Sequence, residues 1–381
     1  MPYKFDEHKE FVRGEISSIA AEIERTSVYP QELIKKLAAK KYLTPTYPEE
    51  YGGLSLTPFE YGRFTETVGK VCQASRALLT VHNSLVGETI LRWGSNEQKK
   101  DYLPGMSSGE KIGAFALSEP KIGSDARNVT TKYERKNGTY IINGKKKWIS
   151  FGGIAKFFLT IAANGNNVSA FLIDKNLNGI KVEEMKGLLA GNGVHIARIE
   201  FDNVEVPESK LLGGEGNGLN YIVSTALDHG RYSIAWGGIA IAQAALEAMV
   251  TYSRKREQFG EKIYKHEAIQ QMIGESTSKL HAARALCEKV AAMRYENHPD
   301  SIMETNIAKY VTSKTAVEIS NEALQVHGGN GAWNEFPVEK LFREARILEI
   351  IEGTSQVQEK LIASFALRRY FDKDLYIDKD F

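Results

Sequence analysis

The stretch EIIEGTSQ, residues 349–356, places a glutamate directly behind two isoleucines and ahead of a glycine and two hydroxyl residues. Apolar neighbours exclude water from a carboxylate, which raises its pKa toward the range in which it acts as a general base. Glu352 is therefore a candidate proton acceptor. A glutamate in this place can also simply end a helix, and the local sequence leaves both interpretations open.

Length and composition restrict the classes of protein to which the chain can belong. Its 381 residues are enough for two or three domains, and 42% hydrophobic with 25% charged residues is typical of a globular protein. The 49 basic and 48 acidic residues leave a net charge of +1, which offers no basic field for nucleic acid. Cys72 and Cys287 stand far apart without metal-ligand spacing, so we expect neither a metal site nor a disulfide.

The N-terminal residues MPYKFDEHKEFVRGEI contain no apolar signal-peptide core and carry several acids. They are therefore unlike a secretory signal or a transit peptide. The sequence shows no uninterrupted run of about 18 apolar residues, the length that a membrane-spanning helix needs. From these features we expect a cytoplasmic protein that does not span a membrane.

The chain divides into regions with different sequence patterns, and the fold of these regions would have to position Glu352. From Phe5 to about Gly109 the apolar spacing is helical. One face of QELIKKLAAKKYL collects Leu33, Ile34, Leu37, Ala38 and Tyr42. Further on, β-rich runs dominate; Asn137-Gly138 predicts a hairpin between two of them, and Pro207 closes the strand predicted in VHIARIEFDNVEVP.

The last part of the chain returns to helical spacing. Long helices are predicted in IAWGGIAIAQAALEAMVTYSRKREQ, HEAIQQMIGESTSKLHAARALCEKVAAMRYE and ETNIAKYVTSKTAVEISNEALQVHG. Such helices indicate an antiparallel bundle rather than βαβ alternation. We therefore predict three domains, spanning residues 1–113, 114–216 and 217–381.

Several familiar motifs are incomplete. The glycine-rich stretches GGEGNG (213–218) and GGNG (328–331) do not complete the G-x-G-x-x-G of a dinucleotide-binding unit. HEAIQ (266–270) has a glutamine where a zinc-binding helix needs its second histidine.

Other stretches carry the functional signal: ALSEPKIGSDA (116–126), KKWISFGG (146–153), RKREQFG (254–260) and QVHGGNGAWNEFPVEKLFREARILEIIEGTSQVQ (325–358). In this order and spacing they closely resemble the acyl-CoA dehydrogenase family of flavoproteins, over nearly the whole chain and most weakly before residue 70. The resemblance implies an α+β, mostly α, fold with an N-terminal helical domain, a middle β-barrel and a C-terminal four-helix bundle. It also implies FAD between barrel and bundle, and a homo-oligomer, either a dimer or, as is usual in the family, a tetramer.

The same resemblance assigns the cofactor contacts, which are Ser118, Trp148, Ser150, Arg256, Phe259, Gln325, Gly329, Thr354 and Gln356. Ser118, Trp148 and Ser150 would lie at the flavin ring, for which a broad indole is suitable. Arg256 and Phe259 would hold the pyrophosphate and adenine end across a subunit interface, where a planar guanidinium suits phosphate. The indole could instead fill the barrel core, and the arginine could belong to a solvated helix end.

For the substrate, the resemblance makes Glu352 the base that removes the proton alpha to a thioester carbonyl, while hydride leaves the beta carbon for flavin N5. A flavin ribityl hydroxyl and the backbone N–H of Glu352 would stabilise the enolate. Ser124, Asp228 and Arg231 match residues along the pantetheine arm, although Asp228 and Arg231 could also form a helix-end ion pair. Gly230 stands where some relatives carry the base instead, and it cannot serve.

The sequence departs from the family pattern at Ile351, Ala332 and Glu267, where relatives carry tyrosine, an aromatic residue and glutamine. His82, His229 and His327 fall in segments near the acyl pocket of relatives. A lone histidine is usually structural. Three together predict a small, polar acyl group rather than a fatty chain.

Several functions remain open at this stage. One is dehydrogenation of a short or polar acyl group on CoA, with electrons passed to electron-transfer flavoprotein or another acceptor. The second is dehydrogenation of a hydroxyacyl-type unit on an acyl carrier protein, as in hydroxymalonyl or methoxymalonyl extender formation for polyketide or nonribosomal peptide biosynthesis. A flavin oxidase would share every motif, whereas a non-catalytic scaffold is disfavoured by the intact Glu352 and FAD residues.

Overall fold

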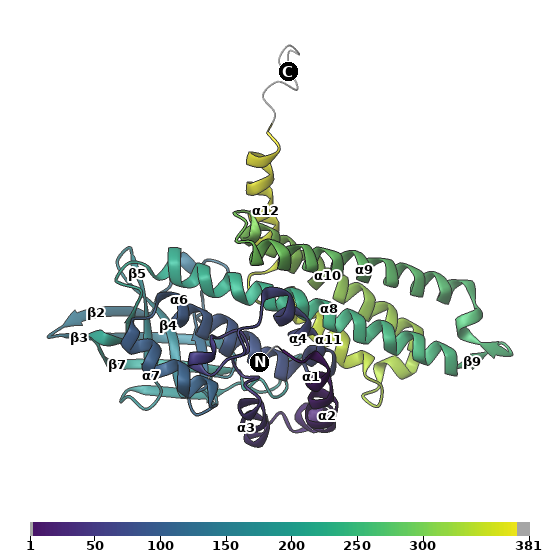
Figure 1. Ribbon diagram of the computed structural model, residues 1–381, viewed down its shortest axis with the longest axis horizontal. Helices are drawn as coiled ribbons and strands as arrows, with labels where there is room; N and C mark the ends of the chain where they lie inside the picture. Colours follow the sequence, from purple (N-terminus) through teal and green to yellow (C-terminus); the bar gives the residue numbers. More distant parts are fainter. Residues whose placement is uncertain (1–2, 372–381) are drawn as a thin grey trace, which may run out of the picture.

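The computed structural model describes residues 3–371, in which helices, a sheet and again helices follow one another along the chain (Figure 1). The first helices are α1 (Phe5–Phe11), α2 (Ser17–Thr26), α3 (Gln31–Ala39), α4 (Pro58–Val71), α5 (Gln73–Leu78), α6 (Glu88–Trp93) and α7 (Asn96–Ser107). Leu33, Ile34 and Leu37 are buried on the predicted apolar face of α3. The helical character predicted for this region is confirmed.

Local chemistry explains where α4 begins. The side chain of Thr57 accepts from the backbone N–H of Glu60 at 3.3 Å, and the Glu60 carboxylate accepts from the N–H of Thr57 at 2.9 Å. This capping box is followed by Pro58, which favours the first helical position. Between α5 and α6 the chain forms a π-helical segment, η3 (Leu79–Gly87), every residue of which is buried. π-helical turns are rare and are often found at functional sites. The packing of η3 therefore bears on where the site lies.

The middle strands form one sheet in the order β6-β7-β3-β2-β4-β5-β8, with β1 paired to β4. They are β1 (Gly113–Ala116), β2 (Lys132–Lys136), β3 (Thr139–Ile149), β4 (Phe157–Asn164), β5 (Asn167–Asp174), β6 (Ile180–Glu184), β7 (Ala197–Pro207) and β8 (Leu211–Leu212). The predicted hairpin joins β2 to β3, with φ values of +50° at Asn137 and +80° at Gly138. β7 ends at Pro207 as predicted, but it begins later than expected because His195 has a left-handed φ of +46°.

The remaining helices are η6 (Gly218–Val223), α8 (Ser224–Lys255), α9 (Glu267–Tyr295), α10 (Ser301–His327), α11 (Val338–Leu348) and α12 (Ser355–Arg369). The long helices α8, α9 and α10 lie side by side, whereas α12 projects away from the body (Figure 1). Segment Gly218–Lys255 alone among the helices of residues 3–371 has the length and hydropathy of a membrane span, by length and composition only. Since 67% of its apolar window is buried inside the protein, α8 is packed as a core helix.

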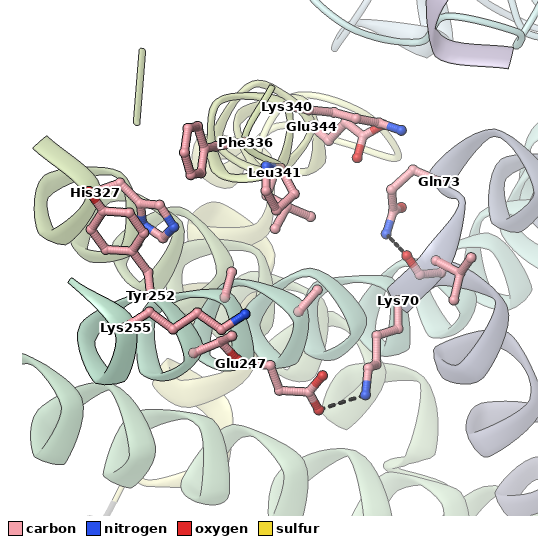
Figure 2. Close-up of a pocket in the computed structure, with 16 residues that line it drawn as sticks. Lys70, Gln73, Glu247, Tyr252, Lys255, His327, Phe336, Lys340, Leu341 and Glu344 are labelled. Carbon is pink, nitrogen blue, oxygen red and sulfur yellow. Dashed lines mark hydrogen bonds and ion pairs between the residues drawn. The ribbon is translucent and has the colours of Figure 1, made fainter. Parts of the chain in front are cut away.

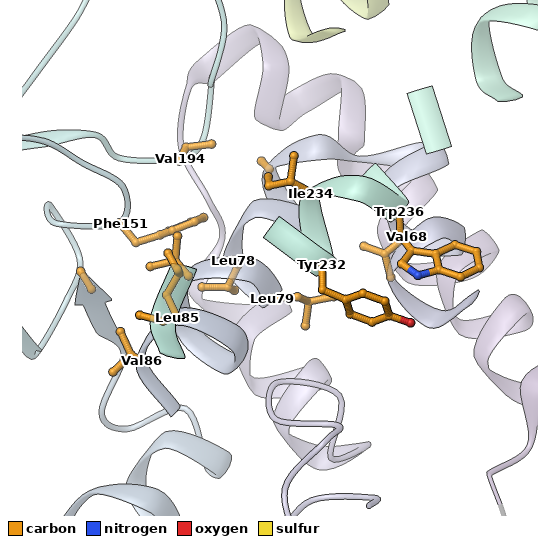
Figure 3. Packing of buried hydrophobic residues seen from close by; sticks show 14 of the residues in the cluster. Val68, Leu78, Leu79, Leu85, Val86, Phe151, Val194, Tyr232, Ile234 and Trp236 are labelled. Atoms are coloured by element: carbon orange, nitrogen blue, oxygen red, sulfur yellow. The ribbon is translucent and has the colours of Figure 1, made fainter. Parts of the chain in front are cut away.

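The N-terminal helices meet α8 along a buried apolar interface (Figure 3). Side chains from α4, α5 and η3 face side chains from α8; those labelled are Val68, Leu78, Leu79, Leu85, Tyr232, Ile234 and Trp236. Gly62 allows α4 to approach closely, since a Cβ there would overlap the indole of Trp236. This contact holds α4 against the first half of α8, and η3 packs on α8 as well.

Candidate active site

Glu352 lies in the turn between α11 and α12 rather than within a helix. Its φ is +54°, a conformation that residues with a side chain rarely adopt, and Gly353 follows with φ +89°. Arg231 Nε and Gln358 Nε2 donate hydrogen bonds to the carbonyl of Glu352 at 2.9 and 3.2 Å. Lys309 Nζ donates to the carbonyl of Gly353 at 2.8 Å. Side chains from three different helices therefore hold this strained turn in place.

The buried Oε2 atom of the Glu352 carboxylate has no hydrogen-bond partner among residues 3–371. Burial raises the pKa of Glu352 to about 7, while the positive charges of Arg231, Lys309 and Arg76 act in the opposite direction. A carboxylate with this pKa is a competent proton acceptor near neutral pH. The helix-end interpretation is not needed, since α11 already ends at Leu348.

Gly230 on α8 faces this carboxylate. A Cβ at position 230 would lie 2.7 Å from Oε2 of Glu352 and 2.6 Å from Cδ2 of Leu85. Real Cβ atoms do not approach so closely, so a side chain at position 230 would force Glu352 or Leu85 to move. The structure thus brings together the glutamate and the position that carries the base in other members of the resembled family.

The two predicted pantetheine-binding residues on α8 have different surroundings. Asp228 forms a bidentate ion pair with Nη1 of Arg294, at 2.8 and 2.9 Å. Arg231, besides holding the Glu352 turn, donates from Nη1 to Asn306 at 2.9 Å. Asp228 therefore shows the ion pair that the sequence had left as an alternative, and a pantetheine contact for either residue stays a prediction.

Ser118 and Trp148 are brought together across neighbouring segments. The backbone N–H of Lys147 donates to the carbonyl of Ser118 at 2.9 Å, which places the ALSEP loop beside the KKWIS strand. Trp148 has a φ of +65° and is 51% exposed, so it does not fill the barrel core. A bent backbone that holds an indole at the surface suits a ring-stacking role. Ser150 follows in the same segment and is partly exposed.

A buried ion pair fixes this loop and strand together. Lys146 Nζ lies 2.8 Å from Oε1 of Glu119, with side-chain exposures of 0% and 1%. Burial lowers the pKa of Lys146 to about 8, although Glu119 opposes the shift. Burial alone would raise the pKa of Glu119, but Lys146 and the Thr130 and Thr131 hydrogen bonds lower it to about 2. Both groups are therefore charged at neutral pH and hold Ser118 in position.

The residues predicted to hold the distal end of FAD lie elsewhere. Arg256 and Phe259 belong to the short hairpin of β9 (Glu257–Gln258) and β10 (Glu261–Lys262), where Phe259 has φ +55° and is 96% exposed. This hairpin also ends α8 earlier than the helical spacing predicts. Figure 1 shows β9 at the opposite end of the molecule from the sheet. One chain therefore does not bring these residues to Trp148.

Further predicted contacts are surface positions. Gln325 is exposed near the end of α10, and a Cβ at Gly329 would touch nothing within 4 Å. Thr354 caps α12, its side chain accepting from the N–H of Val357 at 3.3 Å, and Gln356 is exposed in the first turn. Ser124 is exposed in the loop after β1. These positions are open to a ligand.

The small, polar acyl group expected from three histidines stays a prediction, and two of these rings are held by hydrogen bonds to the backbone. His82 accepts from the N–H of Gly113 at Nδ1, so its Nε2 donates to the carbonyl of Met106 at 3.0 Å. Burial lowers the pKa of His82 to about 4, and the ring is neutral. His327 donates from Nδ1 to the carbonyl of Ala323 at 2.7 Å. Both rings have a structural role, whereas Nδ1 of His229 on α8 lies 3.4 Å from Nη2 of Arg294.

The cavity drawn in Figure 2 is separate from this site. It measures about 510 Å³ and lies between α8, α11 and the end of α4. Its lining includes Lys70, Glu247, Tyr252, Lys340 and Glu344, but not Glu352. We place the chemistry at Glu352 because the buried, unpartnered carboxylate lies there.

Comparison with known sequences identifies the same family that the motifs resemble. The chain matches the N-terminal, middle and C-terminal domains of acyl-CoA dehydrogenase over residues 5–110, 114–204 and 216–367. It is 35% identical to an acyl-CoA dehydrogenase of Bacillus subtilis, over 94% of this chain and 96% of that protein. It is 34% identical to the mitochondrial short-chain specific acyl-CoA dehydrogenase of Homo sapiens, over 95% and 89%.

Solved structures show the same architecture. Butyryl-CoA dehydrogenase from Megasphaera elsdenii superposes with a TM-score of 0.91 at 30% identity, over 95% of this chain and 96% of that one. FkbI, described for biosynthesis of the methoxymalonyl extender unit of a polyketide, superposes with a TM-score of 0.87 at 28% identity, over 95% and 99%. This chain belongs to the acyl-CoA dehydrogenase family: it is an FAD-dependent oxidoreductase that acts on CH–CH donors.

The described residues fit a flavin dinucleotide. Trp148 offers an exposed ring face, Gly329 leaves room for close backbone approach, and the capped N-terminus of α12 favours negative charge. Arg256 and Phe259, exposed at the far hairpin, suit a phosphate and an adenine ring. When bound, FAD supplies the acceptor for a hydride.

Sequence reasoning missed the residues that hold the Glu352 turn through its carbonyls. Lys309 is separated from Gly353 by 44 positions, and Gln358 is only one of several glutamines near the turn. Lys309 and Asn306 share one face of α10, but this spacing is common on helices. Nothing in the sequence pattern distinguishes Lys309 and Asn306 from other polar residues on helices.

Proposed function

We propose that Glu352 is the general base that removes the α-proton of an acyl thioester. The observation that carries this proposal is its buried, unpartnered Oε2, which faces Gly230 and belongs to a carboxyl with a pKa of about 7. The proton would pass from the α-carbon to Oε2 of Glu352, and a carbon–carbon double bond would form as the β-hydrogen leaves with its electron pair. Bound FAD would supply the acceptor for that hydride.

The thioester carbonyl needs hydrogen-bond donors, because an α-proton is otherwise too weakly acidic for a carboxylate. Within the described residues, the backbone N–H of Glu352 donates to no protein acceptor. Its left-handed backbone keeps this N–H available while Arg231 occupies the carbonyl side. The same turn therefore supplies both the base and one donor to the developing enolate.

For the other residues we propose roles that agree with their positions. Trp148, Ser118 and Ser150 would flank the flavin ring, and Arg256, Phe259, Gln325 and Gly329 of a second copy would hold its distal end. Thr354 and Gln356 contribute through the start of α12. Ser124 and Arg231 line the path of the pantetheine arm, and Asp228 acts there through its pair with Arg294.

For the carrier of the acyl group we propose CoA, because the curated relatives are acyl-CoA dehydrogenases, including a short-chain specific one. Electron-transfer flavoprotein is the proposed acceptor. The second candidate is a group on an acyl carrier protein, supported by the likeness to FkbI. A flavin oxidase remains distinguishable by oxygen consumption.

Anaerobic bleaching of the visible flavin band tests this function. We expect a short acyl-CoA to bleach the holoenzyme and Glu352→Gln to slow bleaching by about 10²–10⁴-fold while retaining FAD. Bleaching only by groups loaded on a carrier protein would select the second candidate. A purified protein that binds no FAD, even when FAD is added, would overturn the proposal.

A further inference from the structure

Arg343 on α11 joins three separate parts of the fold. Its Nη1 donates to the backbone carbonyl of Leu189, in the loop of residues 185–196 between β6 and β7, at 2.8 Å. Its Nη2 donates to Oε1 of Glu24 on α2 at 3.0 Å. Its Nε donates to Oε2 of Glu339, one turn earlier on α11, at 2.7 Å, which orients the guanidinium. One planar group therefore binds the N-terminal helices, the barrel loop and its own helix.

The barrel loop also binds the N-terminal helices through its own side chains. Nδ2 of Asn192 donates to Oε1 of Glu24 at 2.9 Å, the same oxygen atom that accepts from Arg343. Further along the loop, Nε2 of His195 accepts from the backbone N–H of Tyr29 at 3.0 Å. The groups that share the bonds to α11 form a clamp, made up of Arg343, Glu24, Asn192 and the carbonyl of Leu189.

The same loop supports the segment that carries the proposed flavin contacts. The backbone N–H of Phe151 donates to the carbonyl of Val194 at 2.7 Å, and the N–H of Gly153 donates to the carbonyl of His195 at 3.1 Å. Trp148 lies only three positions before Phe151. The position of the loop therefore determines where the exposed indole of Trp148 lies.

The candidate base lies on the other side of the clamp. Only a short turn separates Glu352 from the end of α11 at Leu348. Arg231 on α8 and Lys309 on α10 hold this turn, and within residues 3–371 no hydrogen bond joins it to the barrel. In the same part of the chain, Arg343 makes the one hydrogen bond between α11 and the barrel. The clamp thus connects the base to the flavin segment, whereas the helices alone hold the base.

The clamp is partly open to solvent. The side chains of Arg343 and Glu24 are 24% and 22% exposed. Without the guanidinium, water would therefore solvate the carbonyl of Leu189, and Glu24 would keep Lys340 as a partner at 3.5 Å. The protein would stay folded, but the loop and α11 would lose the rigid planar group that fixes their distance.

We propose that Arg343 is a positioning residue for hydride transfer, which sets the spacing between an acyl group at Glu352 and the flavin contacts around Trp148. This assignment rests on the proposed function, because it takes Glu352 as the base and Trp148 as a flavin contact. Reacting atoms must lie about 3–3.5 Å apart, and a misplacement of about 1 Å costs about 100-fold in rate. A loosened loop therefore slows the transfer but leaves the titration of Glu352 unchanged.

Stopped-flow flavin reduction of the holoenzyme by a short acyl-CoA measures this role. We expect Arg343→Gln to lower the limiting rate by about 10–100-fold and to leave the half-saturating thioester concentration nearly unchanged. The rise of the rate with pH, set by the Glu352 pKa of about 7, should stay in place. Arg343→Lys should restore little, because an ammonium cannot bind three acceptors in one plane. Arg346→Gln is the matched control, since Arg346 on the same helix pairs with Glu349 at 2.7 Å.

Hydrogen exchange of the apo-protein tests the clamp without FAD or substrate. In Arg343→Gln we expect the amides of Phe151 and Gly153 to exchange about tenfold faster, an effect equal to the loss of about one hydrogen bond. The Arg346→Gln control should exchange like the wild type. Asn192→Ala removes the barrel side of the clamp and should act in the same direction by a smaller factor, so it serves where Arg343→Gln does not fold.

Several results would overturn the proposal. They are an unchanged limiting rate in both Arg343 variants, an equal loss in Arg346→Gln, and wild-type exchange at Phe151 and Gly153 in Arg343→Gln. A shift of the pH profile in Arg343→Gln would also overturn it, because Arg343 would then act on the Glu352 carboxylate itself. Each of these results leaves the proposed function intact. If no thioester bleaches the wild-type flavin, the proposed function falls and this role falls with it.

Discussion

Two features of Glu352 each cost free energy in the folded protein. Its left-handed backbone is strained, and its carboxylate is buried without a partner. Arg231 and Lys309 compensate by binding the carbonyls of the turn rather than the carboxylate itself. The carboxylate therefore stays available, with a raised pKa that direct pairing would have lowered.

The pH dependence of activity follows from this arrangement. Glu352 must be ionised to accept a proton, and its pKa is raised to about 7. We expect kcat/KM for flavin reduction to be low below this pH, to rise through it and to level off above it. Stopped-flow flavin reduction across pH 5 to 9, roughly the range in which such a group titrates, measures this profile.

Glu352→Gln should lower the rate of flavin reduction by about 10²–10⁴-fold and remove the rising limb. The matched control is Glu349→Gln, three positions earlier, whose carboxylate pairs with Arg346 at 2.7 Å. A glutamine variant that keeps the wild-type pH profile would assign the titration to another group and contradict the role of Glu352.

At the scale of elements, close approach of α4, η3 and α8 builds the wall of the site. Small residues permit this approach at Gly62, Gly69, Gly230 and Gly237. Each of these glycines faces a side chain from a neighbouring element. That side chain packs into the space that the missing Cβ leaves. The position of Leu85 over Gly230, and hence the surroundings of Glu352, depends on this packing.

Gly62→Ala should be destabilising, since its methyl group would overlap the indole of Trp236. We expect a loss of about 1–3 kcal/mol in the free energy of unfolding, the usual effect of overpacking. Gly274→Ala on α9, where a Cβ would meet nothing within 4 Å, should instead stabilise by up to about 1 kcal/mol. Thermal unfolding of the two variants checks this, and similar shifts would show that the α4–α8 contact is loose.

At the scale of the whole molecule, the two sets of FAD residues lie at opposite ends of one chain. Trp148 lies with the sheet, whereas Arg256 and Phe259 lie at the far tip of the helical domain (Figure 1). A side chain that is 96% exposed at such a tip gains contact only from another body. If both sets of residues bind one FAD, as we propose, the site needs a second copy of the chain, and the homo-oligomer expected from the sequence stays a prediction.

Arg256→Gln and Phe259→Ala should therefore weaken FAD binding by about tenfold each, the loss expected for one charged or aromatic contact. Arg254→Gln, two positions before Arg256, is the control and should retain FAD. The absorbance ratio after gel filtration measures FAD content, and sedimentation measures the mass of the assembly. A monomer that retains full FAD would contradict a shared site.

The sequence by itself determined the features whose causes are local. Asn137-Gly138 predicts the β2–β3 turn because both positions need a left-handed backbone, and apolar spacing predicts α3 and α8 because it repeats with the helical period. The motifs around Trp148 and Glu352 identify the family for the same reason: each is a short run whose residues act together.

Tertiary structure alone decided which distant residues meet. Arg231 reaches the carbonyl of Glu352 across 121 positions, and His82 proves structural only because Gly113 and Met106 take both ring nitrogens. Arg76 is likewise one arginine among many in the sequence. Its burial arises when α4 and α8 close around it, and the free energy of such contacts depends on packing between segments, which no local pattern encodes.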